Sequence, residues 1–382
     1  MDQLINQLPF FSHEHRNLAQ SVVQFVAQEI EPRAGSEEDV EGLARDFVSL
    51  LARAGLLNYS VAERKLDVRS LCLIREALAY SSSLADLAFV MQGLGTYAIA
   101  HAAPDHVREF WLSRAANGKA IAAFALTEPE AGSDVAAIQT TARRDGETYV
   151  IDGRKRFISN AGIADFYTVF ARTGTRDDGR AALSAFVVGS KMQGFSVVER
   201  TVLIAPHPIG GIAFHDCRVR AEDMIGNEGD GFGLAMETLD TFRASVGAAA
   251  CGMARRALDE AVRYSSQRKQ FGRPLAEHQL VQAKLADMIT ELDAARLLVY
   301  RAAYARDTST GRFTREASEA KLFATEAAGR IIDSAVQIHG GTGLISGSVV
   351  ERLYRDVRAL RIYEGTSEIQ KLVIAGQLLK EQ

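Results

Sequence analysis

Hydrophobic residues recur every three or four positions through the first third of the chain. The spacing runs through Leu18 and Val22, and alanine- and leucine-rich stretches at 68–81 and 85–102 continue it. That period is typical of an amphipathic helix. We therefore expect an N-terminal α-helical domain over residues 1–118.

The pattern changes over residues 119–230. Apolar or alternating runs become short, at 121–126, 148–151, 167–172, 183–188, 195–198 and 212–214. Turn signals separate them at Asp145-Gly146, Asp152-Gly153 and Asp178-Gly179. Short runs between turns predict antiparallel strands, without the alternation of strands and long helices of a dinucleotide-binding fold. We expect a middle antiparallel β domain here.

Residues 231–382 return to the helical period. The expected helices cover 233–265, 277–306, 315–339 and 348–359, with a last helix from 367. Long helices joined by short glycine-bearing loops predict a four-helix bundle. The fold class is thus α+β and multidomain, with a helical domain, a β domain and a C-terminal four-helix bundle.

Composition narrows the class of protein. The chain has 382 residues, 47% hydrophobic and 24% charged, with a net charge of −4. Its basic residues are dispersed, and we read the cluster at 154–156 as a strand or turn edge, so we expect no nucleic-acid partner. The polar residues after Met1 and the lack of a long apolar run predict a cytoplasmic protein without a membrane segment. The three separated cysteines predict neither a disulfide nor a metal site.

One carboxylate, Glu364, lies in a predicted turn before the last helix. The segment 361–370 reads RIYEGTSEIQ, and Gly365 permits a sharp turn. Ser367 with Gln370 three positions later forms a capping-box pattern, so the helix should begin near Ser367. A rigid loop would hold the Glu364 carboxylate in a fixed position, as a catalytic base requires. An isolated Glu-Gly pair, however, is more often a surface turn.

Two segments of the β region carry candidate binding chemistry. Residues 124–134, FALTEPEAGSD, form a strand and a Pro/Gly/Ser turn whose backbone N–H groups could hold phosphate oxygens. Phe157 and Ser159 share one face of a regular strand, where an aromatic wall beside a hydroxyl suits a planar ring. Each has a structural alternative, an ordinary loop and half-buried strand residues.

Two segments of the helical region resemble helix ends. Residues 268–279, RKQFGRPLAEHQ, offer an arginine for phosphate and an aromatic for stacking, or simply a helix-end cation. Residues 337–343, QIHGGTG, end a helix, and His339 is more typical of a packed ring than of a base.

Together these motifs resemble the acyl-CoA dehydrogenase family, of the short- and medium-chain type, in family order over about residues 22–379. The resemblance implies FAD as the cofactor, an acyl-CoA substrate and an electron-transfer flavoprotein as acceptor. It also implies a homotetramer, a dimer of dimers, whose paired subunits complete each other's flavin sites.

The resemblance also assigns site residues. It places Phe124, Leu126, Thr127, Ser133, Phe157 and Ser159 at the flavin. It places Arg268, Phe271, Gln279, Gln337, Gly340 and Gly341 at the flavin of the neighbouring subunit, and Thr366 and Glu368 beside the base as cofactor contacts. Ser133, Arg243 and Gly365 match substrate positions.

In that family Glu364 would remove the α-proton of the thioester while the flavin accepts the β-hydride. A flavin hydroxyl and the backbone N–H at the base's own position would polarise the thioester carbonyl. Some members carry the base on the long helix before the bundle, where this chain has Thr241, which cannot serve. Glu364 also argues against nitroalkane-oxidising relatives, which have aspartate, and sulfur-compound monooxygenases, which lack the base.

Three departures leave substrate and acceptor open. The loop at 58–65 lacks the usual glycines, the loop at 203–211 carries Pro206 and Pro208, and Phe157 stands where tryptophan is frequent. A dehydrogenase or oxidase acting on a carrier-protein-bound acyl group in a biosynthetic pathway is therefore an alternative. A non-catalytic helical scaffold is disfavoured, because no structural role requires Glu364, Thr127 and Arg268 together.

Overall fold

The computed structural model describes residues 3–35, 38–61, 65–176, 179–309, 311 and 313–380. It divides into two compact units. A helical unit comprises Met1–Ser36, Asp67–Asp86 and Asp240–Gln382, and a sheet unit comprises Glu37–Leu66 and Leu87–Leu239. Part of the predicted N-terminal domain therefore groups with the C-terminal helices, and the three-domain division remains a prediction. Asp178 and residues 62–64 of the predicted loop lie outside the described residues.

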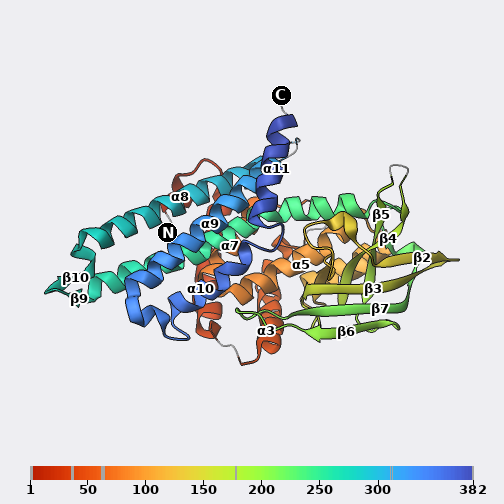
Figure 1. Ribbon diagram of the computed structural model, residues 1–382, viewed down its shortest axis with the longest axis horizontal. Coiled ribbons are helices and arrows are strands. Elements are labelled where there is room, and N and C mark those ends of the chain that lie inside the picture. The colour runs from red at the N-terminus through yellow and green to blue at the C-terminus, as the bar shows by residue number, and fades with distance from the viewer. Residues whose placement is uncertain are drawn as a thin grey trace. The chain divides into compact units, whose positions relative to one another are not determined.

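The helical unit is built on long helices. It contains α1 (Gln3–Gln7), α2 (His13–Phe25), the π-helical turn η1 (Val26–Ile30), α4 (Val68–Ser81), α8 (Gln279–Thr308), α9 (Thr314–His339), α10 (Val349–Leu360), α11 (Ser367–Lys380) and most of α7 (Gly231–Gln267). Helices α7, α8 and α9 run side by side (Figure 1). A Cβ at Gly247 of α7 would meet Val299 of α8 at 2.7 Å, so this contact requires glycine. The predicted bundle is confirmed.

The sheet unit contains one eight-stranded sheet with helices α3 (Val40–Arg53), α6 (Asp105–Ala116) and most of α5 (Ser83–Ala102). Its strands are β1 (Ala122–Ala125), β2 (Thr141–Asp145), β3 (Thr148–Ser159), β4 (Phe166–Thr175), β5 (Ala181–Gly189), β6 (Phe195–Arg200), β7 (Ile209–Arg220) and β8 (Met224–Ile225). The order is β6-β7-β3-β2-β4-β5-β8, with β1 on β4 (Figure 1). Thr168 of β4 donates to the Gly95 carbonyl at 2.7 Å, which fastens α5 to the sheet.

Two features of the sheet differ from the sequence prediction. Strand β1 pairs with β4 in parallel, and β2 meets β4 in parallel at Thr141 and Arg172, so the sheet is mixed. Strand β2 was not predicted, because only Ala142 among its five residues is buried and no alternating pattern results.

A buried ion pair crosses the interior of the sheet unit. The ammonium of Lys155 on β3 lies 2.9 Å from Glu128 and donates to the carbonyls of Leu126 and Phe170. Burial lowers the pKa of Lys155 to about 8, against the opposing attraction of Glu128. The cluster at 154–156, expected at a strand or turn edge, lies in β3, between β7 and β2, and Lys155 is buried there because Glu128 supplies a carboxylate partner.

Other described features bear on the class of protein. Cys72, Cys217 and Cys251 are buried free thiols. Among the residues that the structure describes, no helix has the length and apolarity needed to cross a membrane, and no group of three or more His, Cys, Asp or Glu side chains is placed to hold a metal. A cytoplasmic location stays a prediction.

Lys155→Met should destabilise the protein by about 3 kcal/mol or more, because it leaves Glu128 buried without its cation. Urea denaturation followed by circular dichroism measures the change. Lys191→Met, at an exposed lysine of the same unit, is the control and should change stability by less than about 0.5 kcal/mol. Equal effects of the two substitutions would contradict this account of the ion pair.

Candidate active site

Glu364 lies in the loop between α10 and α11, within the helical unit. Its backbone is left-handed, with φ 53°, and Gly365 follows with φ 87°. A non-glycine residue in this region carries strain that the surrounding contacts must offset. The N–H groups of Ile362 and Tyr363 both donate to the Ala359 carbonyl, which fastens the start of the loop to the end of α10.

Two buried side chains hold the loop through three consecutive carbonyls. The ammonium of Lys321 on α9 donates to the carbonyl of Tyr363 at 3.0 Å and to that of Gly365. The amide of Gln370 on α11 donates to the carbonyls of Glu364 at 3.1 Å and Gly365 at 3.0 Å. Both side chains are fully buried. The backbone around Glu364 is therefore fixed by its neighbours, although its own conformation is unfavourable.

The predicted capping box is wrong. Ser367 is the first residue of α11, and the Thr366 hydroxyl accepts the N–H of Ile369 at 3.3 Å in the capping position. The Ser367 hydroxyl donates instead to Glu326 of α9 at 2.6 Å. Gln370 faces the loop because backbone carbonyls there need donors in a buried place.

The carboxylate of Glu364 is short of partners. Its Oε2 atom is buried and has no hydrogen bond to any described residue. Burial raises the pKa of Glu364, while the nearby cations Arg75, Lys321 and Arg243 act in the opposite direction. A carboxylate with a raised pKa is a stronger base than an exposed one, and an unpaired oxygen is free to take a proton.

The cations around Glu364 are themselves anchored. Arg75 is fully buried and contacts Asp86 through two nitrogens, at 2.8 and 2.7 Å, and the Ser245 hydroxyl at 2.8 Å. Arg243 is paired with Asp240, and its Nε is buried without a hydrogen bond in the described chain. Their positive charge is therefore fixed in place near the Glu364 carboxylate.

The remaining predicted residues of the helical unit lie mainly at the ends of its long helices. Arg268 follows α7 and is exposed. Phe271 is 93% exposed with φ 52°, in the turn between β9 (Lys269–Gln270) and β10 (Arg273–Pro274). Exposed positions at the start of α8 and the end of α9 hold Gln279, Gln337, Gly340 and Gly341. Glu368 in the first turn of α11 is also exposed.

His339 belongs to the packing of this region. Its ring stacks on Tyr264 of α7 with centroids 4.3 Å apart, and its Nδ1 lies 2.7 Å from the Ala335 carbonyl. The preference for a packed ring over a base thus agrees with its surroundings. The stacking also joins the end of α9 to α7 at Tyr264, which lies four residues before Arg268.

In the sheet unit the structure brings two predicted segments together. The N–H of Arg156 on β3 donates to the Thr127 carbonyl at 2.9 Å, while Lys155 holds the Leu126 carbonyl. The turn after β1 therefore lies against the strand that carries Phe157 and Ser159. Phe124 is half-buried against Phe170, and Ser133 is exposed in the turn.

The expectation that Phe157 and Ser159 share one strand face rested on regular alternation, and β3 is irregular there. Its register with β7 shifts between Lys155 and Ile158, and Phe157 has φ 55°. Phe157 consequently points to solvent next to an equally exposed Arg156, whose guanidinium lies 4.8 Å from its ring centre.

The unusual loop at 203–211 contributes a contact that the sequence did not indicate. Nε2 of His207 lies 2.8 Å from the Ser159 hydroxyl, and the Pro208 carbonyl accepts the N–H of Asn160 at 2.7 Å. Burial lowers the pKa of His207 to about 4, so the ring is neutral near pH 7. The loop thus fixes the hydroxyl predicted to meet the flavin.

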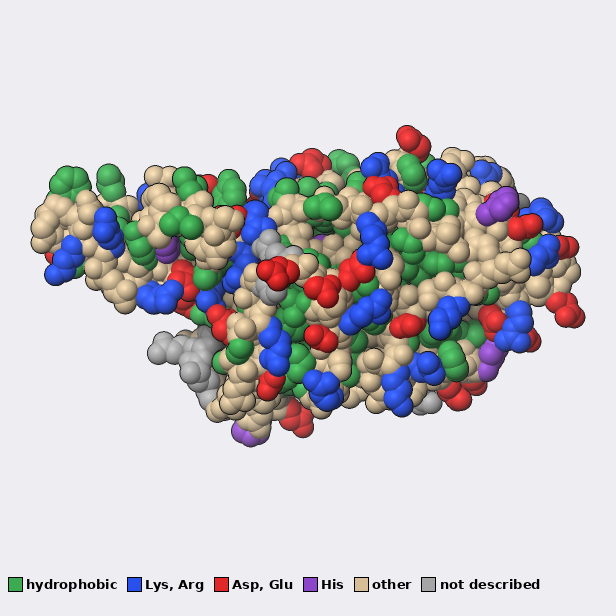
Figure 2. Space-filling model, turned by 90° about the horizontal axis from the view of Figure 1, so that it is seen from below, with side chains coloured by type: hydrophobic (Ala, Val, Ile, Leu, Met, Phe, Trp, Pro, Cys, Tyr) green, Lys and Arg blue, Asp and Glu red, His purple; other side chains and the backbone are tan. Residues whose placement is uncertain are grey.

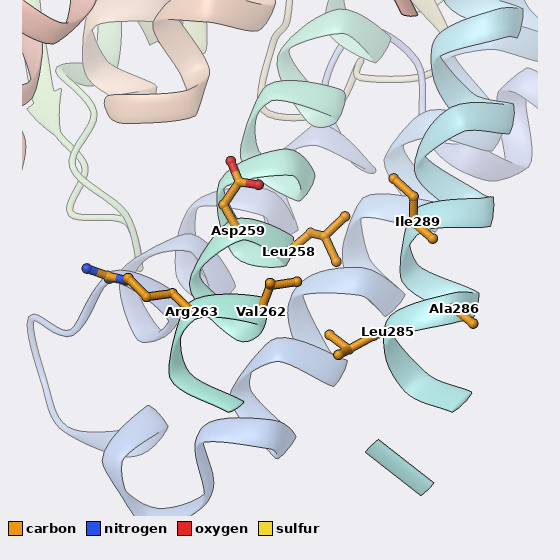
Figure 3. Close-up of a pocket in the computed structure, with 7 residues that line it drawn as sticks. All are labelled: Leu258, Asp259, Val262, Arg263, Leu285, Ala286 and Ile289. Carbon is orange, nitrogen blue, oxygen red and sulfur yellow. The ribbon is translucent and has the colours of Figure 1, made fainter. Parts of the chain in front are cut away.

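A groove of about 520 Å³ lies elsewhere in the helical unit, between α7 and α8. Figure 3 shows Leu258, Val262, Leu285 and Ile289 along it, with Asp259 and Arg263 directed away. It contains none of the predicted site residues. It is an apolar surface feature and carries no chemistry of its own.

Gly365→Ala should destabilise the loop, because φ is 87° and a Cβ would lie 2.5 Å from the Gln370 amide nitrogen. Gly347→Ala is a matched control, since its φ is 83° but open space surrounds it. Strain alone costs about 1 kcal/mol, so we expect Gly365→Ala to cost at least about 1 kcal/mol more than the control in thermal or urea unfolding. Equal losses would show that the Gln370 contact does not constrain the loop.

Three comparisons place this geometry among known proteins. The N-terminal, middle and C-terminal domain families of acyl-CoA dehydrogenases match residues 12–119, 123–217 and 229–379. A 3-(aryl)acrylate reductase of Clostridium sporogenes is 40% identical, with 97% of this chain and all of that protein covered. A cyclohexane-1-carbonyl-CoA dehydrogenase of Geobacter metallireducens is 37% identical over 97% of this chain and 98% of its own.

Solved structures that resemble this chain agree with the family matches. Butyryl-CoA dehydrogenase from Megasphaera elsdenii has a TM-score of 0.89 at 33% identity, covering 97% of this chain and 99% of that one. An acyl-CoA dehydrogenase from Bacillus anthracis complexed with FAD has a TM-score of 0.88 at 31% identity, covering 97% and 68%. A structure described as an electron transferring flavoprotein of Acidaminococcus fermentans has a TM-score of 0.87 at 32% identity, covering 97% and 99%. This chain belongs to the acyl-CoA dehydrogenase family.

Proposed function

We propose that this protein is an FAD-dependent dehydrogenase that converts an acyl-CoA thioester to a trans-2-enoyl-CoA, with Glu364 as the base. The observation that carries the proposal is the buried Oε2 of Glu364, which has no partner among the described residues and belongs to a carboxyl of raised pKa. A structural carboxylate in such a place would be paired. An unpaired one is suited to receive a proton from a ligand.

The residues present fit a flavin. Phe157 offers an exposed ring, and the turn at 127–133 offers a hydroxyl and open backbone at Gly132, where a Cβ would meet nothing within 4 Å. Phe124, Leu126 and Ser159 complete this set. Arg268, Phe271, Gln279, Gln337, Gly340 and Gly341 form an exposed set for the flavin of a neighbouring subunit, and Thr366 and Glu368 lie beside the base. Bound FAD would supply the two-electron acceptor for the β-hydride.

The protein's own residues would carry out the proton transfer. The α-carbon–hydrogen bond breaks, its proton goes to Glu364, and the electron pair moves toward the thioester carbonyl. Fixed cations at Lys321, Arg75 and Arg243 stabilise negative charge in this region without rearrangement. Three residues are the proposed substrate contacts: Gly365, Ser133 and Arg243, whose Nε has no hydrogen bond to any described residue.

The reverse reaction is a second candidate. The relative that is 40% identical is named a 3-(aryl)acrylate reductase, and a 45% identical match over 277 residues is named an acryloyl-CoA reductase. In that direction Glu364 would donate its proton to the α-carbon, which its raised pKa favours. An electron-transfer flavoprotein is the proposed redox partner in either direction, and a carrier-protein thioester remains the alternative substrate.

Anaerobic mixing of the purified yellow protein with acyl-CoA thioesters of increasing length, and with carrier-bound acyl groups, should bleach the flavin. Mixing the reduced protein with enoyl thioesters should restore the colour if the reductive direction is favoured. Glu364→Gln should keep the flavin spectrum and lose at least about 1000-fold in bleaching rate, since the base is removed.

Glu109→Gln is the control for that variant, because Glu109 is an exposed glutamate on α6 of the sheet unit. It should bleach at the wild-type rate. A colourless protein that takes up no FAD would refute the proposed cofactor, and normal bleaching of Glu364→Gln would refute the assigned base.

We also propose the homotetramer. Support comes from large apolar side chains left exposed on the helical unit, at Leu280, Leu344, Leu372 and Leu379 besides Phe271. Figure 2 shows hydrophobic side chains projecting on the left, where Figure 1 places β9, β10 and the ends of α7 and α8. Apolar surface of this kind is typical of an interface.

Light scattering should therefore give about four times the chain mass of 41.5 kDa. Phe271→Ser should lower FAD retention, because the aromatic is proposed to contact the flavin of the paired subunit. A monomer that binds FAD at wild-type strength would contradict the shared site.

A further inference from the structure

Lys321 has the geometry of a group that strengthens the oxyanion donor. Its ammonium donates to the carbonyl of Tyr363 at 3.0 Å. That carbonyl belongs to the same peptide group as the N–H of Glu364. A charge-assisted hydrogen bond to one end of a peptide polarises the group and makes its N–H a stronger donor.

The other end of this peptide is the N–H of Glu364. No described residue accepts a hydrogen bond from the N–H of Glu364, although the carbonyls of residues 363, 364 and 365 are all bonded. Because these carbonyls are all bonded and the N–H of Glu364 has no acceptor among the described residues, this N–H is available to bind a ligand.

We propose that Lys321 is a positioning residue of the oxyanion site, which polarises the Tyr363–Glu364 peptide so that its N–H binds the substrate's thioester carbonyl more strongly. This inference rests on the proposed function. The N–H contact itself is what the family resemblance implies, and the new element is the buried ammonium behind it. Because Lys321 also holds the Gly365 carbonyl, one side chain both orients and polarises the donor.

The surroundings of Lys321 support a role for its positive charge in polarising the peptide. The side chain is fully buried, and burial lowers its pKa to about 8. The charged groups around it are Glu364, Glu326 and Glu368, which favour the ammonium, and Arg243, which opposes it. A neutral polar side chain could bond two carbonyls at a smaller desolvation cost. The charge adds polarisation, which an amide cannot supply to the same extent.

The test uses FAD-loaded protein and 3-thiaacyl-CoA ligands labelled with ¹³C at the thioester carbonyl. Sulfur at the β-position prevents hydride loss, so hydrogen bonding and α-proton acidity are measured without turnover. Isotope-edited infrared spectra should show the bound carbonyl band at lower wavenumber than in free ligand. Lys321→Met should move the band back toward the free position and weaken the acidity of the bound α-proton by about tenfold or more.

Lys321→Gln keeps a neutral donor and should give an intermediate band, and it serves if the methionine variant does not fold. Lys191→Met is the control, because it removes an exposed lysine that has no part in the proposed site. It should leave the carbonyl band of bound ligand unchanged. A wild-type band in a ligand-bound Lys321 variant would overturn the inference and leave Lys321 a structural residue.

The proposed function fails separately. If wild-type protein neither bleaches with any thioester nor shifts the carbonyl band of the 3-thiaacyl ligands, the activity itself is wrong. If wild-type protein does both and the Lys321 variants give the same bleaching and the same carbonyl band as wild type, only the role of Lys321 is refuted.

Discussion

The electrostatics of the helical unit depend on one partly desolvated carboxylate, that of Glu364, which lies among fixed cations. Glu364 is half-buried, with its Oε2 withdrawn from solvent, and it lies near the buried cations Arg75, Lys321 and Arg243, each on a different helix. Water screens buried charges only weakly, so the balance of these charges affects how readily Glu364 accepts a proton. Asp86 and Asp240 hold two of the cations by ion pairs, which keeps the balance independent of side-chain motion. The helices of the bundle thus form the scaffold of an electrostatic site.

The two units use the same device at the segments proposed to form the site. In each, a buried lysine donates to backbone carbonyls of a turn, Lys321 at residues 363–365 and Lys155 at Leu126. Turns that present groups to a ligand cannot bond all their backbone within a helix or sheet. A lysine has several donors on a flexible stem, so one side chain satisfies the carbonyls of an irregular backbone. The cost is desolvation, visible in the pKa of about 8 for both groups.

Periodicity was sufficient for the long elements. The prediction of a helix over 315–339 differs from α9 by one residue, because apolar spacing persists through 26 residues. It failed for β2, which has one buried residue, and for β3 at Phe157, where a bulge interrupts alternation. Glu364 could be singled out from its motif. Lys321 and His207 could not, because each acts on a segment that only the tertiary fold brings near. Gln370 lies six residues from Glu364, but its pattern with Ser367 indicated a capping box and not a contact with the loop. A charge or amide within a helical pattern looks like a solvated face.

The loop that carries Glu364, the proposed base, has a mechanical consequence. Its three carbonyls are held from α9 by Lys321 and from α11 by Gln370, so a small rotation of α11 moves the peptide that carries Glu364. Beyond Gln370 the same helix presents Leu372, Leu378 and Leu379 to solvent. Any body that covers those leucines restricts the helix that follows the Glu364 loop. Assembly would then narrow the range of orientations sampled by the carboxylate, and proton transfer would report on quaternary order as well as on local chemistry.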